Sequence, residues 1–213
     1  MKKLLTYLMI SASALCASAA QPAGRIEALD QLSNEELIVS VPLGKHADLV
    51  RSAQEKEATR LIRGVYAPAT TGCNVETYRN HEVIIISIPA RLLFGPNDTE
   101  LMAGAETYLT PLKRYVRTQT PDLYRMLLVM HTDNTGSTSY TDSLSLSRVE
   151  AVYEFLEDEG LDTRYIFPTA AGATDPIFPN NTMTGRADNR RLEIYLIPGT
   201  RMLDEAKKGR IAF

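Results

Sequence analysis

The 213-residue sequence predicts a two-layer α/β sandwich in its second half, where strand-like and helix-like segments alternate. Glu82 to Pro89 (EVIIISIP) is rich in β-branched residues and too short for a buried helix, which favours a strand. Tyr124 to Met130 (YRMLLVM) is a second apolar run of the same kind. One helical pattern lies between these runs and another follows the second run. We therefore expect a sheet with helices packed against it.

The first expected helix begins near Asn97, because Asn97 and Glu100 have the spacing of a capping box. Apolar residues between Leu101 and Val116 then recur on one helical face. Pro111 interrupts this pattern, so we expect a kink or a restart there.

The second expected helix runs from residue 142 or 143 to Glu159 and stops at Gly160. Two further strands are expected near Tyr165 to Ala170 and Arg191 to Ile197, the latter with apolar and polar residues in alternation. Together these segments assign residues 82–198 to one domain.

Residues 1–20 are predicted to be an export signal, because Lys2 and Lys3 precede an apolar run from Leu4 to Leu15 that ends in small residues. A hydrocarbon core of about 30 Å needs roughly 20 apolar residues, so this run is too short to span it. No later stretch comes closer, and we expect no transmembrane span. Lipidation of Cys16 is not favoured, because Leu15 stands where lipoprotein signals place a small residue.

The segments that flank the domain are less informative. Residues 21–81 are predicted to be an N-terminal extension of unknown role, within which residues 48–63 suit a charged surface helix. Residues 199–213 are a charged tail with a short helix.

Composition excludes several functional classes. The formal net charge is −3, and no basic stripe indicates a nucleic-acid partner. His131 has no second ligand at metal-binding spacing, so we predict a structural or solvent-facing role for it and no metal site. No nucleophile, base and orienting group occur together, so we expect neither enzymatic activity nor a cofactor. Arg191 and Glu193 alternate on a strand and are predicted to be a surface pair of little energetic value.

Arg148 is the informative residue of the second expected helix. Leu144, Arg148 and Val152 lie in line at 3.6 residues per turn, which places a guanidinium at the edge of the buried face. A cation partly removed from water needs an anion or several acceptors, and Asp133 is the nearest carboxylate by topology. Two interpretations are open: an internal salt bridge, or a site where Arg148 binds a carboxylate and Asp133 binds an ammonium.

Four spaced motifs in this half resemble the OmpA-like peptidoglycan-binding domain family. They are His131-Thr132-Asp133-Asn134-Thr135-Gly136, Leu144-Ser145-Leu146-Ser147-Arg148, Asn180-Asn181-Thr182, and Gly185-Arg186-Ala187-Asp188-Asn189-Arg190-Arg191-Leu192-Glu193-Ile194. The resemblance covers about residues 83–197. It implies a βαβαββ module with a mixed sheet and helices on one face, and it favours the binding interpretation.

The resemblance also implies a ligand and a set of contacts. Family members bind peptidoglycan without a covalent bond, and the Asp and Arg of the first two motifs grip the amino and carboxylate groups of meso-diaminopimelate in the stem peptide. The matching positions here are Asp133 and Arg148, and Asn97, Thr135 and Arg190 are expected to line the same pocket.

Three positions depart from the family pattern. Thr141 replaces an asparagine before the second motif and keeps only a hydroxyl for the pocket. Met130 replaces a glycine, and Gly95 replaces an acidic residue.

These expectations support two functional hypotheses. The first is tethering of the protein to the cell wall in the periplasm, including at the inner face of the outer membrane. The alternative is an envelope assembly or adaptor subunit that contacts a protein partner through residues 21–81, with a weak or vestigial wall pocket.

Overall fold

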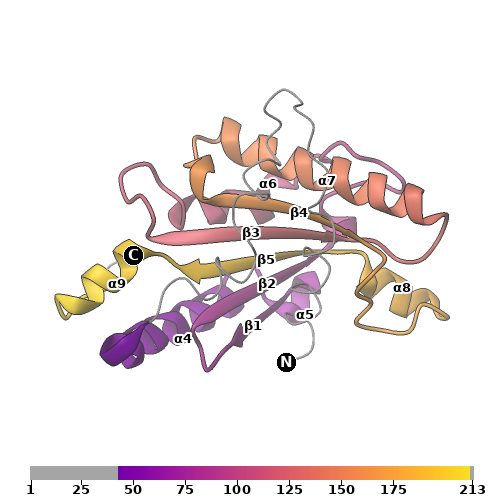
Figure 1. Ribbon diagram of the computed structural model, residues 1–213. Coiled ribbons are helices and arrows are strands. Elements are labelled where there is room, and N and C mark those ends of the chain that lie inside the picture. Colours follow the sequence, from indigo (N-terminus) through magenta and orange to yellow (C-terminus); the bar gives the residue numbers. More distant parts are fainter. Residues whose placement is uncertain (1–42, 212–213) are drawn as a thin grey trace, which may run out of the picture.

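The computed structural model describes residues 43–211, which build a five-stranded mixed sheet with helices packed on it (Figure 1). The strand order is β1-β2-β5-β3-β4. The strands are β1 (Asn74–Tyr78), β2 (Val83–Pro89), β3 (Tyr124–His131), β4 (Ile166–Gly172) and β5 (Arg191–Pro198). The predicted export signal and residues 21–42 lie outside the described residues.

Strand β5 is the centre of the sheet. It pairs antiparallel with both β2 and β3, while β3 pairs parallel with β4 and β1 pairs antiparallel with β2. All eight residues of β5 are buried. The mixed sheet is as predicted, and β2, β3, β4 and β5 each lie within two residues of their expected bounds.

The main hydrophobic core lies between one face of the sheet and the helices. Alternate strand residues such as Ile86, Leu128 and Ile194 face this core and are fully buried. The longest helix, α7 (Thr138–Asp158), packs Val149 and Val152 onto β3 and β4. The expectation of a two-layer sandwich is therefore confirmed.

The chain before β2 adds a helix and an edge strand to the same core. Helix α4 (Ala47–Arg63), expected from its charged pattern, buries Gln54 and Glu57 on its inner side. Gln54 donates to the backbone oxygens of Glu82 and Leu196 and accepts from the Tyr124 hydroxyl at 2.8 Å. Thus α4 is fixed to the sheet by buried polar contacts as well as by apolar packing.

Glu57 makes the second buried polar contact of α4. Its carboxylate accepts from Arg60 and from the Tyr115 hydroxyl, at 2.7 and 2.6 Å, and lies 3.4 Å from Arg114. Burial raises the pKa of Glu57, but these donors and cations outweigh burial, so its pKa is lowered overall. The carboxylate is therefore ionised in the folded protein and needs these partners.

Three local expectations differ from the structure. The first predicted helix does not begin near Asn97: it is a short helix α6 (Glu106–Leu109) followed by a 3-10 helix η3 (Thr110–Arg114). Asp98, and not Asn97, accepts the turn hydrogen bonds from the backbone N–H groups of residues 99 and 100. The restart expected at Pro111 is present, since η3 begins beside it. Helix α7 begins four residues earlier than expected, with Ser137 as its N-cap.

Helices α8 (Met183–Asn189) and α9 (Thr200–Lys207) lie at opposite ends of the sheet (Figure 1). The α-helices α5 (Pro68–Thr71) and α8 were not predicted, and α8 leads directly into β5. Helix α9 is the short helix expected in the tail. Two further 3-10 helices are η1 (Gly44–His46) and η4 (Thr163–Tyr165), and η2 (Ala90–Leu92) follows β2. Among residues 43–211, no helix has the length and apolar character needed to cross a membrane.

Candidate functional site

All six predicted site residues line one cavity of about 470 Å³. They are Asn97, Asp133, Thr135, Thr141, Arg148 and Arg190. Their side chains come from residues 97, 133–148 and 190, three regions that are distant in the sequence, so the folded sheet brings them together.

Strand pairing explains how these segments meet. Arg191, the first residue of β5, pairs with Pro89 at the end of β2 and with His131 at the end of β3. The loops that follow β2 and β3 therefore emerge at the same edge of the sheet, beside the segment that precedes β5. The N-terminal half of α7 closes the cavity with Thr141 and Arg148.

Arg148 is a buried cation held by backbone carbonyls. Only 4% of its surface is exposed, its Nε donates to the carbonyl of Asp98 at 2.7 Å, and its Nη2 donates to the carbonyl of Gly95 at 3.1 Å. The guanidinium also stacks over the Phe94 ring, 5.0 Å from its centroid. Burial lowers the pKa of Arg148, although an arginine remains protonated at neutral pH. Among residues 43–211 it makes no ion pair, and its described acceptors are these carbonyls.

Asp133 is a buried carboxylate with defined partners. One oxygen accepts from the backbone N–H of Thr135 at 2.8 Å, and the other forms an ion pair with Arg190. Burial raises the pKa of Asp133, but the contacts with Thr135 and Arg190 outweigh it and lower the pKa overall. Asp133 is thus ionised at neutral pH. Its partner Arg190 keeps 44% of its side chain exposed and is free to move toward solvent.

The two interpretations left open for Asp133 and Arg148 can now be separated. The internal salt bridge between them is not formed, because Asp133 pairs with Arg190 and Arg148 uses carbonyl acceptors. The two opposite charges instead line the same cavity from two parts of the chain, the loop after β3 and helix α7. This arrangement can receive a carboxylate at Arg148 and an ammonium at Asp133.

Tyr140 is a cavity residue that the sequence analysis did not identify. Its hydroxyl donates to Asn97 Oδ1 at 3.2 Å and so links the loop after β2 to the start of α7. Its ring lies against Gly136, where a Cβ would approach the ring to 2.8 Å. Gly136 also has φ +105°, which an L side chain rarely adopts. Gly136 of the first motif therefore leaves room for the Tyr140 ring. This glycine is the sequence feature that could have pointed to Tyr140.

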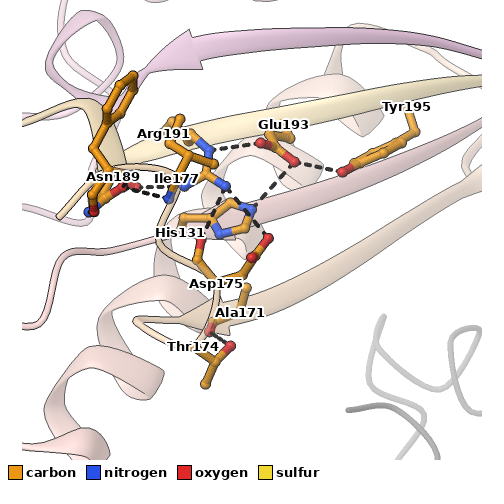
Figure 2. Close-up of polar contacts among 10 residues, drawn as sticks. His131, Ala171, Thr174, Asp175, Ile177, Asn189, Arg191, Glu193 and Tyr195 are labelled. Atoms are coloured by element: carbon orange, nitrogen blue, oxygen red, sulfur yellow. Dashed lines mark hydrogen bonds and ion pairs between the residues drawn. The ribbon is translucent and has the colours of Figure 1, made fainter. Parts of the chain in front are cut away.

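A buried polar network, drawn in Figure 2, adjoins in sequence the residues that line the cavity. Glu193 accepts from Arg191 at 2.7 Å and from the Tyr195 hydroxyl at 2.6 Å, and it lies 3.7 Å from His131. Arg191 also donates to the backbone oxygens of Asn189 and Asp175. Arg191 and Glu193 form the predicted pair, but its predicted surface position is wrong, since both residues are at most 2% exposed.

Burial sets the charge state of this network. It lowers the pKa of His131 and would raise that of Glu193, but His131 and Arg191 outweigh the second effect and hold the pKa of Glu193 far below its usual range. His131 was expected to be either structural or solvent-facing, and its burial fits the structural role. His131 directly precedes Thr132 and lies two residues before Asp133, and Arg191 directly follows Arg190. The network therefore fixes the backbone that carries the cavity charges.

Comparison with known proteins identifies the domain. The OmpA family model matches residues 93–190. The probable lipoprotein YiaD of Escherichia coli is 30% identical over 131 residues, which cover 60% of this chain and 57% of that protein. The peptidoglycan-binding protein ArfA of Mycobacterium bovis is 39% identical over 72 residues, which cover 34% of this chain and 22% of that protein. This chain therefore matches less than two thirds of the length of either relative.

The crystal structure of a putative MotB-like protein from Desulfovibrio vulgaris has the same fold, with a TM-score of 0.59 and 24% identity. The likeness covers 71% of this chain and 94% of the other. It extends beyond the 98 residues matched by the family model, in agreement with a sheet that includes more of the chain. Residues 93–190, which the OmpA family model matches, hold all six predicted site residues.

Proposed function

We propose that this protein binds peptidoglycan without a covalent bond, through the diaminopimelate side chain of the stem peptide. One observation carries the proposal: a buried Arg148 on helix α7, held by backbone carbonyls, and an ionised Asp133 in the loop after β3 line a single cavity. The side chain of diaminopimelate ends in a carboxylate and an ammonium on one carbon. The relation to a peptidoglycan-binding protein over 72 residues supports the same conclusion.

Arg148 is the carboxylate anchor in this proposal. Its Nε and Nη2 groups hold the loop after β2, so the loop and the guanidinium are oriented before the ligand arrives. The N–H groups that remain, chiefly those of Nη1, are available to a ligand carboxylate. Because few atoms need to be ordered on binding, the contact retains most of its favourable energy.

Asp133 is the ammonium anchor, and Arg190 is its present partner. A ligand ammonium would share Asp133 with Arg190 or displace it toward solvent, which the half-exposed position of Arg190 allows. Thr135 holds the carboxylate in place during this exchange through its backbone N–H. Loss of either anchor should cost about 2–4 kcal/mol, because the other charge of the bound ligand would stay buried without a partner.

The test is a sedimentation assay on purified insoluble peptidoglycan of the diaminopimelate type. Asp133→Ala and Arg148→Ala should each weaken retention by roughly 30- to 1,000-fold. Asp204→Ala and Lys207→Ala are the matched controls, since these residues form an exposed ion pair on α9 far from the cavity. Both controls should bind as the wild type does, and circular dichroism should confirm that all variants are folded.

Competitors can identify the ligand group. Free meso-diaminopimelate should release the protein, whereas cadaverine (1,5-diaminopentane) lacks both carboxylates and pimelate lacks both amines, so neither should compete well. Equal release by cadaverine would contradict the role of Arg148, and equal release by pimelate would contradict that of Asp133. Absence of wild-type binding from a folded protein would overturn the proposal and favour the adaptor alternative.

The proposal places the protein in the periplasm in contact with the wall. The relation to envelope lipoproteins supports this placement. Fractionation of cells that express the full chain should recover the protein with the wall fraction and lose it on addition of meso-diaminopimelate. Recovery in the cytoplasm would contradict both the placement and the predicted export signal.

A further inference from the structure

The cavity carries its charged side chains at two depths. Asp133 and Arg148 are at most 5% exposed and form its inner part. Arg91 and Arg190 also line the cavity, but both are exposed residues. We call Arg91 and Arg190 the rim arginines. Arg190 belongs to one of the four spaced motifs, whereas Arg91 lies outside all of them.

Strand pairing places the rim arginines on neighbouring segments. Pro89 at the end of β2 pairs with Arg191 at the start of β5. One residue further, the backbone N–H of Ala90 donates to the carbonyl of Arg190 at 2.9 Å. Arg91 follows Ala90 directly in η2. The two arginines therefore leave adjacent backbone segments at the same edge of the sheet.

The charges that line the cavity are unequal. Among residues 43–211, the charged side chains in its lining are three arginines and one aspartate. The end group of diaminopimelate brings one ammonium and one carboxylate, so its binding leaves the excess of positive charge unchanged. An ammonium on Asp133 would also weaken the present ion pair of Arg190. The cavity is therefore complementary to a ligand with more negative charge than this end group supplies.

Arg91 is held loosely where it stands. Its Nη2 donates to the carbonyl of Thr71 at 3.4 Å, which is long for a hydrogen bond. Among residues 43–211 it forms no ion pair. Gly72 leaves room for this position, because a Cβ there would approach Nη2 to 2.7 Å. The guanidinium thus rests against the backbone at the end of α5 and can turn toward a ligand without breaking a strong contact.

The stem peptide has further carboxylates next to diaminopimelate. The glutamate that precedes diaminopimelate is joined to it through the side chain and keeps its α-carboxylate, and a stem without a cross-link ends in another carboxylate. Only a short methylene chain separates the end group of diaminopimelate from the peptide backbone. With the end group on Arg148 and Asp133, these carboxylates would lie at the rim of the cavity.

We propose that Arg91 binds a second carboxylate of the stem peptide at the rim of the cavity, beside Arg190. The inference rests on the proposed wall binding and adds a selection to it: the site prefers a stem with a free carboxylate next to diaminopimelate. Arg190 supports the same carboxylate once a ligand ammonium has taken its place on Asp133. The contact is exposed, so it should change the affinity by roughly three- to five-fold.

The test is isothermal titration calorimetry with three soluble stem peptides. The first is L-alanyl-γ-D-glutamyl-meso-diaminopimelyl-D-alanine, the second carries an amide on the glutamate α-carboxylate, and the third carries an amide on the terminal carboxylate. At least one of the amides should weaken binding to the wild type by roughly three- to five-fold. The same amide should make no difference in Arg91→Gln. The amide that weakens binding identifies which carboxylate Arg91 holds.

Arg117→Gln is the matched control. Arg117 is also an exposed arginine, its Nε donates to the carbonyl of Lys113 at 3.3 Å, and it does not line the cavity. This variant should distinguish the peptides as the wild type does, and Arg91→Lys, which keeps the charge, should retain part of the difference.

The outcomes separate this inference from the proposed function. Equal binding of all three peptides by the wild type would overturn the inference, and the proposed function would still stand if Arg148→Ala weakened the binding of every peptide. An equal loss of affinity for all three peptides in Arg91→Gln would also overturn the inference, because it would indicate a structural role for Arg91. Absence of binding of any peptide by the wild type would overturn both.

Discussion

Removal of one buried charge from the polar network in Figure 2 should destabilise the whole domain. Glu193→Gln keeps the size of the side chain but removes the negative charge that faces Arg191. Arg191 would then retain two backbone oxygens and the carboxylate of Asp175 at 3.9 Å. Removing one partner of a buried ion pair costs roughly 3–5 kcal/mol. Because Asp175 remains nearby, we expect the lower end, about 3 kcal/mol of the free energy of unfolding.

Urea unfolding measures this loss. Denaturant slopes of about 1–3 kcal/mol per molar convert a loss of about 3 kcal/mol into a midpoint lower by about 1–3 M. Glu76→Gln is the control, because Glu76 is an exposed glutamate on the edge strand β1 and its change should stay within about 0.5 kcal/mol. A loss below about 1 kcal/mol for Glu193→Gln would refute the argument that Arg191 depends on this carboxylate. The double variant Arg191→Met with Glu193→Leu should recover only part of the loss, because it removes both charges but also takes away the Glu193 acceptor of the Tyr195 hydroxyl and the Arg191 partner of Asp175.

Three further predictions concern charge. Burial lowers the pKa of His131, so the unfolded chain binds a proton on this histidine more readily than the folded chain does. The free energy of unfolding should therefore fall as the pH drops from about 6.5 through the lower pKa of the folded state. Thermal melts at several pH values should show a smaller dependence of the melting temperature on pH in His131→Gln than in the wild type. Glu57→Gln leaves Arg60 and Arg114 facing a neutral side chain, so it should lower the free energy of unfolding by about 2–4 kcal/mol. Urea unfolding of this variant should remain one cooperative transition. A separate early transition would contradict the packing of α4 as part of the same domain. Arg190→Ala should reduce wall retention by about five-fold or less in the sedimentation assay, because a half-exposed ion pair contributes at most about 1 kcal/mol; a loss equal to that of Asp133→Ala would make Arg190 a primary anchor.

The main strands and the site could be predicted because their signals are local. β2, β3 and β5 are short runs of β-branched and apolar residues, and a run of this kind has few alternatives to a strand. The cavity charges were found through spaced motifs, which carry information about residues that meet only after folding. Periodicity alone left the roles of Asp133 and Arg148 open, and the structure was needed to show that Arg190 is the partner of Asp133.

The errors arise where distant segments decide the outcome. Alternating charges on β5 indicated a solvent-facing side, but a loop that contains Asp175 covers Arg191 and Glu193. β1 is a short edge strand of mixed polarity, and it forms because β2 offers a free edge for pairing. The integration of α4 depends on Gln54 and Glu57, whose partners lie on other elements. Polar residues that become buried by remote contacts have no local signature.

The position of β5 has a consequence for the order of folding. It is the last of the described strands along the chain, yet it is the central one, and it joins β2 to β3 through pairs as distant as Ile84 with Leu196. Before residues 191–198 have left the ribosome, the β1–β2 hairpin and the β3–β4 pair share no strand and cannot form one sheet. Contacts of such long range also form slowly. A nascent chain of this topology therefore cannot complete its sheet until residues 191–198 have been synthesised, so the two halves of the sheet wait for the strand that joins them.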